Sequence, residues 1–177
     1  MSAHSKTAAT PMFEPLLNEF QVEAACTRRV LERIPADKLS WRPHPRSMSL
    51  GQLAQHIAGV PGRFSEVIVK DHHEADPQNF ANFPSPENLG ALLATFDQGV
   101  RAGEDFLAGL TEAAALQDWT LMLGGKPIFT KPRMAVIRMI MLNHWYHHRG
   151  QLSVYLRLLD VPVPSIYGPS ADENPFA

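Results

Sequence analysis

Two histidines four residues apart, His144 and His148, stand in an apolar stretch of the 177-residue chain that contains no proline. On a helix this spacing points both imidazoles the same way, so that their nitrogens can share one divalent cation. A third histidine, His56, lies on a separate helical pattern far upstream. Three neutral imidazoles from two packed helices would form a metal site with at least one open position, which is the arrangement that metal catalysis needs.

A less specific interpretation is that each histidine hydrogen-bonds a backbone carbonyl or a buried hydroxyl group, as a single histidine on an apolar face usually does. However, His144 and His148 share one inward stripe with core residues, and two neighbouring buried imidazoles cannot both be protonated cheaply. A shared cation satisfies both rings at once. Because His56 lies on the inner stripe of a second helix, the sequence favours the metal.

The charge around this predicted site also differs from that of the zincin proteases. Their helix carries a general-base glutamate directly after the first histidine, where this chain has Trp145. No Asp or Glu lies between Met134 and Leu159. Three neutral ligands leave the cation its full charge, so we expect an anionic fourth ligand such as hydroxide, carboxylate or thiolate.

Four neighbouring residues are candidates for supporting roles. Gln151 and Tyr155 follow His148 by about one and two turns and could orient a ligand or donate to an oxyanion, although packing alone would explain Tyr155. His147 faces away from its neighbours and is expected on the flank of the helix, exposed or in contact with a metal ligand. Arg149 could meet an anionic substrate, but a solvated side chain or a salt bridge between subunits is the stronger expectation.

Four long helical patterns must position these residues, at about 12–33, 49–69, 85–110 and 132–159. Ser47 or Ser49 can cap the second helix and Ser85 the third. The polar segment 71–84 is expected to be a loop or a short turn. Gly124 and Gly125, between two apolar runs, predict a β-hairpin. The fold class is therefore all-α, a four-helix bundle with a small β-hairpin before the last helix. We expect a flexible tail over 1–11, the bundle over 12–160 and an extended tail over 161–177.

Composition narrows the class of function. The formal net charge is −2 with a pI near 6.4, which gives no sign of an electrostatic nucleic-acid binder. Apolar runs are far shorter than the roughly 18–20 residues that cross a bilayer, and 1–10 shows no signal-peptide pattern. Cys26 is the only cysteine, so no disulfide framework exists. We therefore expect a cytoplasmic protein that contacts neither nucleic acid nor membrane.

Two segments carry a resemblance to a known family. The first comprises residues 39–43 (LSWRP) and 47–56 (SMSLGQLAQH), and the second comprises residues 144–152 (HWYHHRGQL) and 155–157 (YLR). Together they resemble the signatures of the DinB/YfiT-like metalloenzymes, a resemblance that extends from the first helix to the end of the fourth. It implies helices in up-down-down-up order, often a homodimer, and a zinc, nickel or related divalent ion held by His56, His144 and His148.

The same resemblance points to thiol chemistry, since the family is similar to bacillithiol transferases and mycothiol-dependent isomerases. On this view the protein is a metal-dependent transferase or hydrolase, in which the ion activates a low-molecular-weight thiol or water toward a small-molecule substrate. The alternative is a non-catalytic, stress-associated bundle whose metal is structural or sensed. A structural site is normally closed by four protein ligands, and the sequence offers no convincing fourth.

Overall fold

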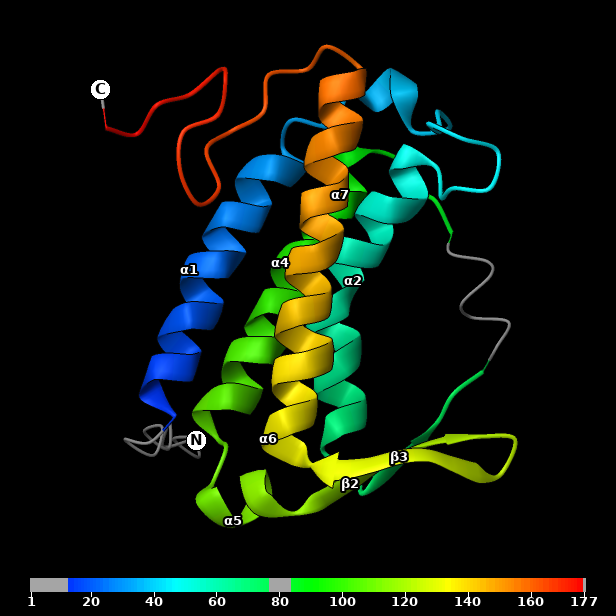
Figure 1. Ribbon diagram of the computed structural model, residues 1–177, viewed down its shortest axis with the longest axis vertical. Coiled ribbons are helices and arrows are strands. Elements are labelled where there is room, and N and C mark those ends of the chain that lie inside the picture. The colour runs from blue at the N-terminus through cyan, green and yellow to red at the C-terminus, as the bar shows by residue number, and fades with distance from the viewer. Residues whose placement is uncertain (1–12, 77–83, 177) are drawn as a thin grey trace, which may run out of the picture.

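The computed structural model describes residues 13–76 and 84–176 and is mostly helical (Figure 1). Its long helical segments are α1 (Glu14–Leu31), α2 (Leu50–Ile68), α4 (Leu89–Ala108) and α7 (His144–Leu158), the last continuing from α6 (Arg133–Val136) and a π-helical turn, η2 (Ile137–Asn143). These segments lie side by side, with α1 and α7 running up the view and α2 and α4 running down it. The expected helical fold is confirmed. The N-terminal tail predicted for 1–11 lies outside the described residues.

The helix that carries His56 begins as the sequence predicts. Ser49 caps α2 in a reciprocal capping box: its Oγ accepts from the backbone N–H of Gln52 at 3.2 Å, and Gln52 Oε1 accepts from the Ser49 N–H at 2.9 Å. The cap predicted for the third helix was wrong. Asn88, three residues after Ser85, caps α4 by accepting from the Ala91 N–H at 2.9 Å. Asparagine is as favourable as serine at the N-cap position. Asn88 directly precedes Leu89, where the apolar helical pattern of α4 begins.

The predicted hairpin forms below the helices, between β2 (Asp118–Leu123) and β3 (Lys126–Pro132) (Figure 1). Gly124 and Gly125 both have positive φ, 57° and 73°, as a two-residue turn of this kind requires. The expectation of a loop over 71–84 was wrong at its start, where β1 (His72–Glu74) pairs with β2 in parallel. Its partner strand lies more than forty residues away in the sequence, so no local sequence pattern predicts the pairing. Residues 77–83 lie outside the described part of the chain.

One buried tryptophan fixes α7 against α2. Trp145 is fully buried, and its ring stacks on Phe20 of α1 and lies near Phe96 of α4, with centroids 5.5 and 6.1 Å away. Its indole N–H donates to the carbonyl oxygen of Ile57 at 3.0 Å. Trp145 follows His144 and Ile57 follows His56. This hydrogen bond therefore fixes how α7 and α2 are aligned along their axes, so that the two histidines lie side by side.

The remaining segments lie at the ends of the helices. A short 3-10 turn, η1 (Ala36–Lys38), follows α1, and α5 (Glu112–Leu116) connects α4 to β2. Residues 161–176 carry no helix or strand and run beside the upper ends of α1 and α7 (Figure 1). Ion pairs from Asp172 to Arg157 and from Glu173 to Arg29 hold this segment to the helices. Within the described residues, no helix has the length and apolar character needed to cross a membrane.

Candidate metal centre

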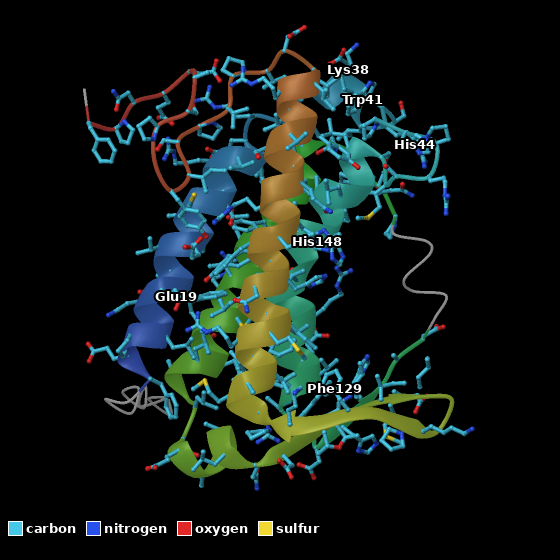
Figure 2. All side chains as sticks on the ribbon, viewed as in Figure 1. Glu19, Lys38, Trp41, His44, Phe129 and His148 are labelled. Atoms are coloured by element: carbon cyan, nitrogen blue, oxygen red, sulfur yellow. The ribbon has the colours of Figure 1, made fainter. Side chains whose placement is uncertain are left out.

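The three predicted histidines converge between α2 and α7. His144 Nε2 lies 2.9 Å from Nε2 of His148 and 3.3 Å from Nε2 of His56. The rings stand nearly perpendicular to one another in each pair, with centroids 4.4 to 5.0 Å apart. Figure 2 labels His148 about midway along the continuous helix formed by α6, η2 and α7. All three rings therefore present the same nitrogen to one point, with their planes fanned around it.

These separations suit a small divalent cation. Zinc–imidazole bonds of about 2.0–2.1 Å in a tetrahedral site place the nitrogens about 3.4 Å apart. The spacing between His56 and His144 already matches this value, and that between His144 and His148 is about half an ångström short. His56, His144 and His148 form the cluster that could hold a metal ion among the described residues. Their donor atoms lie within 4.8 Å of one another. The donor set thus fits a metal with an open position.

Burial keeps these imidazoles neutral. It is the main cause that lowers the pKa of His56 from 6.5 to about 3 and the pKa of His144 to about 4. Protonation of His148 and the positive charge of Arg63 act in the same direction on both rings, whereas the backbone carbonyl of Ile140 partly opposes the change at His144. At neutral pH the nitrogens therefore offer lone pairs, which is the state that binds cations.

Three of the four candidate supporting residues, Gln151, His147 and Tyr155, occupy different places. The amide oxygen of Gln151 lies 2.8 Å from Nδ1 of His148, on the side of the ring away from the cluster. His147 is exposed, with its ring centroid 4.9 Å from that of His148. Tyr155 donates its hydroxyl to the backbone carbonyl of Met48 at 3.3 Å, so this hydroxyl contacts the backbone just before α2. Of these three residues, Gln151 is thus the one that forms a hydrogen bond with a candidate metal ligand, His148.

The expectation of a solvated or intersubunit Arg149 was wrong. Its side chain is fully buried and forms an ion pair with Glu23 of α1, with 2.6 Å between Nη1 and Oε2. The guanidinium also donates to Thr27 Oγ1 at 3.1 Å and lies over the ring of Tyr146. Arg149 follows His148 directly and therefore faces a different side of α7, where its contacts with Glu23 and Thr27 join α7 to α1.

Sequence reasoning missed one charged residue near the centre. Arg63 of α2 donates from Nη2 to the carbonyl oxygen of His56 at 3.3 Å, and its charge acts on both His56 and His144. The signal was present in the sequence, because seven residues separate His56 from Arg63 and two helical turns return to the same face. Without coordinates, nothing distinguished this arginine from a solvated one.

The fold and the site together define a class of protein. It is a helical protein in which three histidines from two helices form a candidate metal centre. A model of the DinB family matches residues 1–175, and the chain therefore belongs to the DinB family. The resemblance carried by the two sequence signatures is confirmed at the level of the family.

Individual proteins are similar to this chain in sequence or in fold. The chain is 24% identical over 165 residues to the uncharacterized protein YrdA of Bacillus subtilis, covering 92% of this chain and 93% of that protein. A crystal structure of a DinB-like protein from Bacillus cereus is 21% identical with a TM-score of 0.67, over 87% of this chain and 97% of that one. A DinB-like protein of B. subtilis, YjoA, is 22% identical with a TM-score of 0.63, over 83% and 93%. These structures share the fold.

Proposed function

We propose that the protein is a metal-dependent enzyme in which His56, His144 and His148 hold a divalent ion, zinc or nickel. The observation that carries the proposal is the convergence of three Nε2 atoms from two helices at separations that suit metal bonds. When bound, the ion would lower the pKa of a low-molecular-weight thiol or of water and so supply a nucleophile for transfer or hydrolysis. Membership in the DinB family supports the same reading.

The donor set supports a catalytic site over a structural one. Structural zinc sites are closed by four protein ligands, whereas catalytic sites keep a position for substrate or water. Among residues 13–76 and 84–176, no thiol or carboxylate joins the three imidazoles in the cluster. The protein's own part in the reaction is to hold three neutral rings in a fixed, fanned arrangement. Gln151 orients one of them, and the neutral ligands leave the positive charge of the centre undiminished.

The test is metal loading followed by thiol titration. The protein, purified without a histidine tag, is loaded with zinc, nickel or cobalt, and the metal content is measured. We expect one ion per chain and, in the cobalt form, a change in the visible spectrum when a small thiol is added. His148→Ala should lose both properties. Failure to take up any metal would contradict the proposal. Uptake without a response to any thiol or electrophile would favour a structural or sensing site.

A further inference from the structure

Arg63 lies on the same face of α2 as His56, two helical turns further along. Its side chain folds back along the helix toward the histidine, and Nη2 donates to the His56 carbonyl oxygen at 3.3 Å. The charged group is therefore held near the metal centre, although Arg63 as a residue is exposed at the surface. A guanidinium in this position can meet a molecule that enters from solvent.

The place of the guanidinium depends on Gly59. A Cβ atom added there would lie 2.8 Å from both Cζ and Nη2 of Arg63, and the three nearest atoms to it all belong to that side chain. Glycine inside a helix is less stable than alanine. The lack of a side chain at Gly59 leaves the space that the guanidinium fills, one turn from His56.

A positive charge on α2 acts on the histidine cluster. The charge of Arg63 lowers the pKa of both His56 and His144. Burial also lowers the pKa of the Arg63 guanidinium, so its charge is partly removed from water. A charge in such a place attracts an anion more strongly than one on an open surface.

We propose that Arg63 is a carboxylate-binding subsite of the metal centre. A ligand that fits is a small molecule with a carboxylate for the guanidinium and a second, metal-seeking group a few bonds away that reaches the three histidines. The planar fork of an arginine matches a carboxylate with two parallel hydrogen bonds. This inference rests on the proposed function, because it assigns the class of ligand to the same site.

Two thiols of equal length test the subsite. The cobalt-loaded protein is titrated with 3-mercaptopropionate and with its uncharged amide, and binding is followed in the visible spectrum. We expect the wild type to bind the carboxylate at least about tenfold more tightly, as a charge-assisted hydrogen bond provides. Arg63→Gln should bring the ratio of the two dissociation constants close to one and leave the amide's affinity unchanged. Arg101→Gln, which removes the same charge from an exposed position on α4, should keep the wild-type ratio.

A second variant separates position from charge. Gly59→Ala keeps every charge and all three histidines but displaces the guanidinium of Arg63. We expect it to take up cobalt like the wild type and to lose most of the preference for the carboxylate.

The outcomes of this test distinguish the two proposals. Cobalt uptake by the wild type without a preference for the carboxylate overturns the subsite and leaves the metal centre standing, as does a preference that survives Arg63→Gln. A wild type that takes up no cobalt overturns both proposals.

Discussion

Oε1 of Gln151 lies 2.8 Å from Nδ1 of His148, which fixes the form of that imidazole. An amide oxygen only accepts hydrogen bonds, so Nδ1 must carry the proton. Nε2 of His148 is then left with its lone pair directed at the Nε2 atom of His144, 2.9 Å away. Partners of this kind orient metal-binding histidines and raise their basicity. Gln151, an exposed residue one turn beyond His148, thus holds His148 in the tautomer that can bind a cation.

Replacing Gln151 should therefore weaken metal binding without unfolding the protein. We expect Gln151→Leu to lower zinc affinity by about 10- to 100-fold, the usual effect of losing such a partner. Gln151→Glu should retain the affinity, because a carboxylate accepts the same hydrogen bond. Competition with a chromophoric chelator measures both. Gln98→Leu, at an exposed position of α4, is the control. Equal affinities in all four proteins would show that Gln151 does not orient His148.

The two neighbouring histidines of α7 should behave in opposite ways. His144 contributes Nε2 to the cluster, whereas His147 is exposed and lies outside it. We expect His144→Ala to lose stoichiometric metal binding and His147→Ala to keep it. Equilibrium dialysis followed by metal analysis of untagged protein distinguishes them. Loss of the ion in His147→Ala, with His144→Ala still loaded, would assign the metal to a different set of ligands.

The metal-free protein should lose stability in mild acid. In the folded chain the pKa of His56 is about 3 and that of His144 about 4, against 6.5 for an ordinary histidine. Between these values and 6.5 the unfolded chain binds protons that the folded chain does not, so falling pH favours unfolding. Above 6.5 both states are neutral, and this contribution vanishes.

Urea unfolding of the metal-free protein between about pH 4.5 and 7.5 measures this dependence. The double variant with His56→Gln and His144→Gln provides the comparison, since its carboxyl groups titrate as in the wild type. Its free energy of unfolding should fall less steeply with acid. Identical slopes for the two proteins would mean that the histidine cluster takes no part in the acid sensitivity.

The features that follow from local sequence were predictable. Helical periodicity gave the long helices, Ser49 gave the start of α2, and the Gly124–Gly125 pair gave the hairpin. The i, i+4 spacing placed His144 and His148 on one face of α7, because helix geometry alone determines it. The homodimer expected from the sequence stays a prediction, which light scattering over a wide concentration range would test.

Features that depend on distant parts of the chain were not predictable. The parallel pairing of β1 involves three residues and a strand more than forty positions away. The π-helical turn before His144 has a different backbone hydrogen-bonding pattern from the α-helix. No particular residue composition marks such a turn in the sequence. Arg63 and Arg149 look alike in the sequence as single charges on amphipathic helices. Only packing puts one beside the histidine cluster and buries the other against Glu23.

We expect the buried pair of Arg149 and Glu23 to stabilise the fold and to take no part in metal binding. Arg149 is fully buried and lies 2.6 Å from Glu23, a side chain that is itself almost enclosed. Arg149→Leu leaves the Glu23 carboxylate without its cation. Breaking such a pair costs about 3–5 kcal/mol, so the free energy of unfolding should drop by an amount of that order.

Metal binding and a double variant complete the test of this pair. Folded Arg149→Leu protein should still bind one zinc ion, because the guanidinium faces away from the histidine cluster. Adding Glu23→Leu should recover part of the stability, since replacing both ions with apolar groups removes the uncompensated buried charge. Arg157→Leu, which breaks an exposed pair with Asp172, should change stability little. Equal effects of Arg149→Leu and Arg157→Leu would contradict the assignment of Arg149 as the buried link between α7 and α1.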